Sequence, residues 1–447
     1  MFFDTIFTTI GSSTAKIKVY NLNEKNLQIS AIGLGGGAES PYSINVQGVL
    51  NPNNQFTNVE LRAKDSLYIF VEVKVDPLNV NSPVFIEDSI VFLTNGNQQA
   101  VKLLAYGQDM VVFKNKKILN DTILSAEKPY LIYGDLEVDT AKTLTLEPGS
   151  KLYFHAGASL VVYGNLIAEG TIIAPILMRG DRTDKLFEEV PYNYVSNQWG
   201  GILLLYKEGN HKLNYVRMNS GYVGVYFSNS DRRFRPRLEI NNSRIHNFLK
   251  YGLVVQNGDV LVTNTEISNT GAYSVFLNGG KHTFIHSTIA NYFNSTNILM
   301  QPSGKEGNAA LMIMELNKIL PMESIFQNCV ISGSSNEEFQ ILSRFADRYN
   351  GVFTNSYIRK TEPEPIPPMF TDIKWYNLKD TVFVNSYFDR EKLEYYNFML
   401  DSLSPARDIG DYNVALQYPT DMNGNSRLED GKPDAGAYEW IGKTGTP

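Results

Sequence analysis

The residues Asn242-Ser243-Arg244-Ile245-His246-Asn247 begin a repeat from which the architecture of the chain can be predicted. The pattern returns 22 residues later as Asn264-Thr265-Glu266-Ile267-Ser268-Asn269, and after another 22 residues as His286-Ser287-Thr288-Ile289-Ala290-Asn291. Looser copies begin at Asn328, Asn355 and Asn385, where insertions widen the spacing. Regular spacing of this length is typical of a parallel β-helix, in which each coil buries its apolar residues by stacking on the next. We therefore predict that Asn242 and Asn264 occupy equivalent corners of successive coils, about 4.8 Å apart.

Asparagine is unusually frequent, with 43 copies among 447 residues. Its side chain tolerates left-handed turn conformations and can stack in hydrogen-bonded ladders. The first position of each repeat is therefore expected to form a ladder that shapes the corner of the coil and carries no chemistry.

The repeat does not extend over the whole chain, which is too long for one ordinary compact core. Between Thr143 and Thr171, pairs of apolar residues alternate with single glycines, which predicts solenoid walls from about residue 121. Before residue 110, short alternating runs between turn clusters predict about seven strands of a β-sandwich. We expect an all-β protein with a sandwich at 1–110, a β-helix with loop insertions at 121–403, and a segment at 404–447 that caps the last coil.

The composition excludes several classes of protein. Hydrophobic residues make up 43% and charged residues 19%, as in soluble globular proteins. The net charge of −7 argues against nucleic acid as a partner. The single Cys329 excludes an internal disulfide framework, and the five histidines contain no HExxH pair of a zinc protease. Nucleophile elbow, phosphate-loop and dinucleotide-binding motifs are absent, and no apolar run is long enough to span a membrane.

The repeat also predicts which side chains share a surface. If Ile245 and Ile267 point inward, the residues on either side of them point outward. Arg244 and Glu266 then form one outer column, and His246 lies in the next column, within about 5 to 8 Å. Arg244, His246 and Glu266 are therefore candidate catalytic residues, because polysaccharide lyases need a base and a group that neutralises a uronate carboxylate. The alternative is an ion pair that only solvates the surface.

Two further stretches are candidate ligand-binding sites. Arg232, Arg233 and Arg235 belong to the one basic cluster of an acidic chain, and arginine binds carboxylates or sulfates in two-point fashion. The alternative is a charged turn, and we expect this run to be continuous with the Arg244 face. Trp375 and Tyr376 lie in the proline-rich insertion 361–380 and are candidates for stacking on sugar rings.

No metal site or cofactor is predicted. The stretch 421–425 alternates oxygen-bearing side chains in the manner of a calcium loop. Lys432 stands where such a loop needs a bidentate glutamate, so calcium finds no support and a turn-stabilising role is expected.

Longer stretches resemble known families. Phe3-Asp4-Thr5, Val19-Tyr20-Asn21, the run 63–71 and Thr94-Asn95-Gly96 resemble the N-terminal immunoglobulin-like module of Gram-negative bacterial surface lipoproteins. Residues 121–447 resemble right-handed parallel β-helix proteins of the pectate-lyase-like superfamily. The stretches 404–408, 421–427 and 433–439 are similar to the terminal segment of bacterial β-helix surface proteins.

The resemblance implies an immunoglobulin-like β-sandwich followed by a right-handed single-stranded parallel β-helix. It also implies export to the cell surface or to the outer membrane and periplasm. The signal and lipidated cysteine of such lipoproteins are absent from this sequence, which is interpreted as a mature or trimmed chain. Contact with a membrane is then expected only through that missing lipid anchor.

Two functions remain open from the sequence. The first is a non-catalytic protein that binds an extracellular polysaccharide or other glycan. The alternative is a polysaccharide lyase or glycoside hydrolase that acts in a groove on one face of the β-helix. A cleft with perturbed acidic or basic groups favours the enzyme, and a face of asparagine, tyrosine and hydroxyl groups favours binding.

Overall fold

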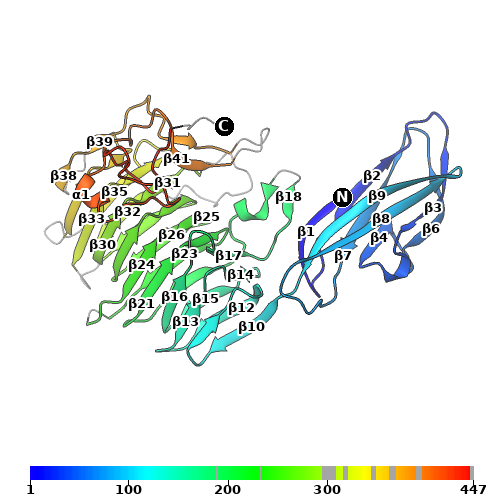
Figure 1. The fold of residues 1–447 in the computed structure, drawn as a ribbon, viewed down its shortest axis with the longest axis horizontal. Helices are drawn as coiled ribbons and strands as arrows, with labels where there is room; N and C mark the ends of the chain where they lie inside the picture. The colour runs from blue at the N-terminus through cyan, green and yellow to red at the C-terminus, as the bar shows by residue number, and fades with distance from the viewer. Residues whose placement is uncertain are drawn as a thin grey trace. The chain divides into compact units, whose positions relative to one another are not determined.

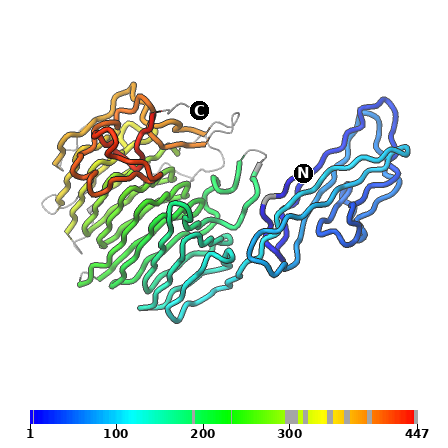
Figure 2. The backbone as a smooth tube through the Cα atoms, viewed as in Figure 1, coloured from blue at the N-terminus to red at the C-terminus, as the bar shows by residue number. Residues whose placement is uncertain are grey.

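The computed structural model describes residues 1–187, 190–231, 233–293, 309–315, 321–343, 349–361, 369–388 and 395–442. The chain divides into two compact units, Met1–Val111 and Val112–Pro447 (Figures 1 and 2). The boundary expected at residue 110 lies one residue from this division.

The first unit consists of two sheets that share one core. The five-stranded sheet has the order β1-β9-β8-β3-β6, with β1 at Phe2–Phe7, β3 at Leu27–Leu34, β6 at Gln55–Leu61, β8 at Val84–Thr94 and β9 at Asn97–Gln108. The four-stranded sheet has the order β2-β7-β4-β5, with β2 at Ala15–Tyr20, β4 at Tyr42–Val46, β5 at Val49–Leu50 and β7 at Ser66–Val73. Ile32 of β3 and Ile69 of β7 are fully buried between them. The immunoglobulin-like assignment stays a prediction. Strand β6 pairs with β3, although β4, which lies between them in the chain, belongs to the other sheet.

The second unit is built from three parallel ladders of short strands, which we name ladders 1, 2 and 3. Ladder 1 contains β11 (Thr122–Leu124), β13 (Thr143–Leu146), β16 (Asn165–Glu169), β21 (Asn210–Asn214), β24 (Arg237–Asn241), β27 (Asp259–Thr263), β30 (Gly280–Ile285), β33 (Met322–Gln327), β36 (Tyr349–Thr354) and β38 (Met369–Thr371). Ladder 2 contains the first part of β12 (Tyr130–Val138), then β14 (Lys151–Phe154), β17 (Ile176–Gly180), β22 (Val216–Asn219), β25 (Arg244–Phe248), β28 (Glu266–Thr270), β31 (Thr288–Asn291), β34 (Val330–Gly333), β37 (Tyr357–Ile358) and β39 (Lys374–Trp375). Ladder 3 contains the end of β12, then β15 (Ser159–Val162), β20 (Gly201–Leu204), β23 (Val223–Ser228), β26 (Tyr251–Gln256), β29 (Val275–Asn278), β32 (Leu311–Glu315) and β35 (Phe339–Ser343).

One coil takes one strand from each ladder in turn, as β24, β25 and β26 do (Figure 1). Each strand then pairs in parallel with its counterpart in the next coil, so β25 pairs with β28 and β28 with β31. These long parallel ladders confirm the predicted parallel β-helix.

The corner between ladders 1 and 2 explains the asparagine of the repeat. Asn242 and Asn264 have φ angles of 49° and 45°, in the left-handed region that asparagine tolerates better than most residues. The side-chain Nδ2 of Asn264 donates a hydrogen bond to Oδ1 of Asn242 at 3.3 Å. Both the equivalent corners and the ladder of side chains are therefore confirmed.

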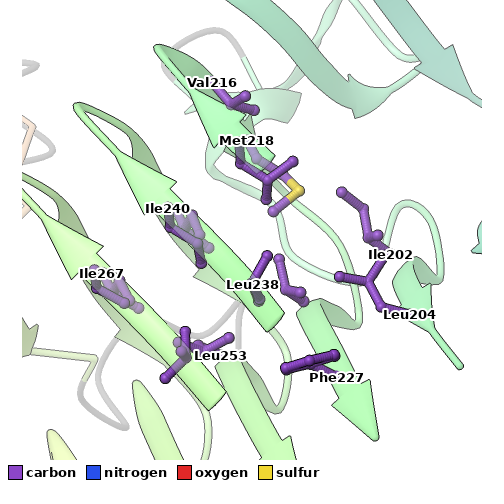
Figure 3. Close-up of a cluster of buried hydrophobic side chains, with 14 of the residues drawn as sticks. Ile202, Leu204, Val216, Met218, Phe227, Leu238, Ile240, Leu253 and Ile267 are labelled. Atoms are coloured by element: carbon purple, nitrogen blue, oxygen red, sulfur yellow. The ribbon is translucent and has the colours of Figure 1, made fainter. Parts of the chain in front are cut away.

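The core lies inside the coils, where side chains of alternate strand positions meet. Ile240, Leu253 and Ile267 come from three different strands and pack into one cluster (Figure 3). Ile245 and Ile267 face each other in register and are fully buried, so the residues on either side of them point outward as predicted.

The sequence suggested that the C-terminal segment caps the last coil. In the structure this segment also contacts earlier coils. It contains helix α1 (Tyr412–Ala415), and its hydrogen bonds run along the corner between ladders 1 and 2. Asn264 donates to the carbonyl of Thr420 at 3.0 Å, Asn328 to that of Asp411 at 3.1 Å, and Asn355 to that of Ile409 at 3.2 Å. The segment therefore covers the side of several coils, because the corner asparagines present side-chain donors to it.

The structure also buries groups that titrate near neutral pH. Burial raises the pKa of Glu338 to about 8. Burial has the opposite effect on histidine, because it disfavours the charged imidazolium. It lowers the pKa of His211 and of His282 to about 4, that of His246 to about 3, and that of His286 well below its ordinary value.

We expect the stability of the protein to pass through a maximum between about pH 6 and 7. An acid with a raised pKa stabilises the fold while it is protonated, and this contribution is lost as the pH rises from about 4.5 to about 8. Histidines that must stay neutral destabilise the fold as the pH falls below about 6.5. Thermal midpoints measured from about pH 5 to 9 test this expectation. In the Glu338→Gln variant, the thermal midpoint should fall less steeply above pH 7 than in wild type. A wild-type thermal midpoint that stays constant from about pH 5 to 9 would contradict the expected maximum.

Candidate functional site

The outer face of ladder 2 brings together the catalytic candidates of the sequence. Arg244 at the start of β25 lies opposite Glu266 at the start of β28. The guanidinium Nε donates to Oε1 of Glu266 at 2.9 Å, and His246 lies one outward position further along β25. Arg244, His246 and Glu266 thus share one face, as the repeat predicted. Their chemical role is a separate question that depends on their surroundings.

Glu266 is fully buried, and both of its oxygens are occupied. Oε1 also accepts a hydrogen bond from the Ser268 hydroxyl at 2.6 Å, and Oε2 accepts one from the Tyr438 hydroxyl of the C-terminal segment. Burial works to raise the pKa of Glu266, but the Arg244 charge and these two hydroxyls outweigh it and hold the pKa below its ordinary value. The carboxylate is therefore ionised at neutral pH and has its lone pairs directed at protein donors.

His246 is buried beside this pair and is neutral at pH 7, because burial and the Arg244 charge lower its pKa to about 3. The Tyr194 ring lies 6.3 Å from its imidazole, and Tyr395 stacks on Tyr194 with 4.2 Å between the ring centroids. Burial raises the pKa of both tyrosines, which are therefore protonated. The face offers aromatic rings and hydroxyl groups next to a guanidinium.

A second arginine completes the face. Arg217 of β22 lies directly opposite Arg244 in register, and its Nη1 donates to the backbone carbonyl of Asn242 at 2.9 Å. Burial lowers the pKa of Arg217, but an arginine keeps its charge at any physiological pH. Among the described residues, two positive charges therefore lie in adjacent strands beside the one negative charge of Glu266. Like charges in direct opposition destabilise a sheet unless something compensates them.

Four residues of this face were not predicted from the sequence, namely Arg217, Tyr194, Tyr395 and Tyr438. Arg217 had a weak signal, since Tyr215-Val216-Arg217-Met218-Asn219 is a degenerate copy of the repeat, 27 residues before the copy at Asn242. Tyr215 has a φ of 49° and thus adopts the conformation of the corner asparagines. The three tyrosines belong to other segments, so the repeat could not indicate them.

The basic run lies at a different corner. Arg232 falls outside the described residues. Arg233 forms an ion pair with Asp231, with its Nε 2.9 Å from Oδ1, and Arg235 lies 3.8 Å from Asp259. Strand β24 separates the run from the corner beside Arg244 by about 13 Å of extended chain. The run precedes β24 and the Arg244 face follows it, so a continuous surface across this strand stays a prediction.

Trp375 and Tyr376 are engaged with the protein. Trp375 is in register with the inward-pointing Ile358 and packs edge-on against Phe370 at 5.0 Å, so it ends the core stack at the last coil. Tyr376 accepts a hydrogen bond from Arg359 at 3.1 Å, and the Arg359 guanidinium lies 4.1 Å from its ring centroid. Their proposed role in sugar stacking stays a prediction.

The stretch 421–425 is a turn held by one aspartate. Asp421 Oδ1 accepts from the backbone N–H groups of Asn423 at 2.8 Å and Asn425 at 2.7 Å, and Oδ2 accepts from Glu439 N–H at 2.9 Å. Its oxygens are thus directed at protein donors, which is the turn-stabilising role that the sequence suggested. Within the described ranges, no cluster of three or more His, Cys, Asp or Glu side chains is arranged to hold a metal ion.

Comparison with known proteins gives few matches. No protein-family model matches the chain. "Protein bark beetle" of Drosophila melanogaster is 30% identical over 107 residues, which is 22% of this chain and 3% of that protein. A family 123 glycoside hydrolase from Clostridium perfringens, solved to study glycolipid glycan hydrolysis, matches 28% of this chain and 26% of its own at 11% identity and a TM-score of 0.19. Such a similarity carries no argument about function, and the fold alone defines the class, a parallel β-helix protein.

None of the described helices is both long and apolar enough to cross a bilayer.

Proposed function

We propose that this protein binds an acidic extracellular polysaccharide on the outer face of ladder 2 and does not cleave it. The observation that carries the proposal is the pair of arginines, Arg217 and Arg244, in adjacent strands beside one buried carboxylate. The Arg244 side chain remains 28% exposed at this face. A uronate carboxylate or a sulfate would supply the missing negative charge and accept two hydrogen bonds from a guanidinium.

The surrounding rings support the same ligand class. Tyr194 and Tyr395 form a stacked pair next to His246, and Phe388 stacks on Tyr395 at 5.2 Å. Both tyrosines are partly exposed, so their ring edges and hydroxyl groups can meet a sugar. Export to a cell surface, which the sequence resemblance implies, would bring such a face into contact with extracellular polysaccharide.

Binding is favoured over catalysis by the state of the carboxylate. Glycoside hydrolysis needs two carboxyl groups, one of them able to give a proton. Glu266 is ionised, and its described partners are a guanidinium and two hydroxyls. His246 is buried, and its lowered pKa keeps it neutral at pH 7. The lyase or hydrolase remains the second candidate from the sequence, and activity assays can test it directly.

We expect the Arg217→Met variant to bind polygalacturonate about 10-fold to 100-fold more weakly than wild type. A hydrogen bond to a charged group contributes about 1.5–3 kcal/mol. Glu266 keeps its partner Arg244 when Arg217 is replaced. Affinity electrophoresis of the full chain, with dextran as the neutral comparison, measures the effect. Binding should also weaken with salt, since the contacts of partly exposed charges are screened.

Two controls make the experiment decisive. The Arg233→Ala/Arg235→Ala variant should bind as wild type, because these residues lie at the other corner with their own carboxylates. A stronger loss in this variant than in Arg217→Met would move the site to the basic run. If prolonged incubation with polygalacturonate produces new reducing ends or unsaturated uronate ends, the protein cleaves the polymer. The function is then that of a hydrolase or lyase and not of a binding protein.

A further inference from the structure

The first unit carries a second face with the same chemistry. Strands β2 and β7 pair in antiparallel register, so that Lys18 lies opposite Tyr68 and Lys16 opposite Phe70. The alternate residues Leu67, Ile69 and Val71 of β7 are fully buried in the core. Because side chains alternate across a strand, the lysines and the aromatic rings point to the outer face of the sheet.

The rings and ammonium groups on this face lie close together. The Lys18 Nζ is 4.8 Å from the ring centroid of Tyr20 and 5.3 Å from that of Tyr68, and the Lys16 Nζ is 5.3 Å from the same Tyr68 ring. The rings of Tyr68 and Phe70 are nearly parallel, at 22° and 6.5 Å between centroids. Tyr20 is 59% exposed and Tyr68 37% exposed. We name Lys16, Lys18, Tyr20, Tyr68 and Phe70 the aromatic platform.

The charge of the platform differs from that of its surroundings. Residues 1–111 contain seven Lys and Arg against ten Asp and Glu, so the unit is acidic. Elsewhere in this unit, Lys64 pairs with Glu24 at 2.8 Å and Lys102 with Glu87 at 2.9 Å. Among the described residues, neither Lys16 nor Lys18 has an acidic partner at such a distance. Their ammonium groups are held over rings, which leaves them able to meet an anion from solution.

We propose that the aromatic platform is a second binding site for an acidic polysaccharide. Exposed rings on the outer face of the sheet suit stacking against sugar rings, and the two ammonium groups lie where they can meet carboxylate or sulfate substituents. An acidic polysaccharide uses both the exposed rings and the ammonium groups, because it carries sugar rings and negative charges along one chain. The platform would bind the same class of ligand as the outer face of ladder 2, but its residues belong to the other unit.

The test compares variants of the full chain on polygalacturonate and on dextran. The Lys16→Gln/Lys18→Gln variant and the Tyr68→Ala variant should each bind polygalacturonate about 5-fold to 10-fold more weakly. The matched control is Lys64→Gln/Lys102→Gln, which removes the same charge from paired lysines and should bind as wild type. Because all of these positions are exposed, thermal midpoints should stay close to that of wild type.

The outcomes separate the two sites. Combining Lys16→Gln/Lys18→Gln with Arg217→Met should weaken binding more than either change alone. If the platform variants bind as wild type while Arg217→Met does not, the platform proposal is overturned and the ladder 2 site stands. If the reverse holds, the ladder 2 site is wrong and the platform stands. Equal losses on duplex DNA or on phosphatidylglycerol vesicles would overturn the polysaccharide as the occupant, and a wild-type chain that binds no uronate or sulfated glycan would remove both proposals.

Discussion

The Phe326→Ala variant is expected to unfold with a free energy about 3–5 kcal/mol below that of wild type, the cost typical of deleting a buried phenylalanine ring. Phe326 of β33 is the middle member of a column of rings inside the coils. Its ring centroid lies 4.7 Å from that of Phe284 and 4.6 Å from that of Phe353, and the rings are inclined by only 7° and 3°. The three residues face each other in register in successive coils. Removing the middle ring opens a cavity that neither neighbour can fill, because both are fixed to their own coils.

The matched control is the adjacent residue of the same strand. Ile325 points to the outer face and is only partly buried, so Ile325→Ala should cost about 1 kcal/mol or less. Chemical denaturation followed by circular dichroism measures both variants. A loss for Phe326→Ala no larger than that for Ile325→Ala would show that the column of rings does not stabilise the β-helix.

The Arg427→Met variant is expected to destabilise the second unit by about 3–5 kcal/mol, as is typical when one partner of a buried ion pair is removed. Arg427 belongs to the C-terminal segment and is fully buried. Its guanidinium bonds to Glu439 Oε2 at 3.2 Å, to Asn264 Oδ1 at 3.2 Å and to the carbonyl of Gly436 at 3.0 Å. It therefore joins the segment to the corner of the β-helix, and its loss leaves a buried carboxyl without a cation.

Two measurements distinguish local release of the segment from global unfolding. Limited proteolysis should cut the variant within 404–442 before the coils unfold, and the thermal midpoint should fall. Lys432→Met is the control, because this lysine is exposed in the same segment and should leave both readouts unchanged. A variant as stable and as resistant to protease as wild type would show that Arg427 does not hold the segment in place.

The two expected losses depend on different kinds of information. The position of Phe326 follows from the repeat, since it lies on the strand before the copy at Asn328 and its neighbours in the column have equivalent places. The role of Arg427 does not follow from any local pattern. The sequence predicted only that its segment would cap the last coil, whereas the structure places it along the corner of several coils.

In the candidate site, too, one part could be predicted from the repeat and the other part depends on distant segments. Arg244 and Glu266 were predicted to share a column, and they pair at 2.9 Å, because register and alternation follow from a spacing of 22 residues. Whether that carboxylate could act as an acid or base was not predictable. The answer depends on Tyr438, which binds Glu266 from 172 residues away along the chain, and on burial, which no spacing reveals.

The sequence by itself thus determined the coil, the inward and outward faces, and the corner asparagines. These features arise from residues adjacent in the chain and from a repeat that places identical chemistry at identical corners, where a left-handed φ favours asparagine. Only the tertiary structure decided which distant segments cover those faces. Tyr194, Arg427 and Tyr438 reach the repeat by packing of segments outside it, and such contacts depend on the shape and free hydrogen-bonding groups of the finished coils rather than on any periodicity of the chain.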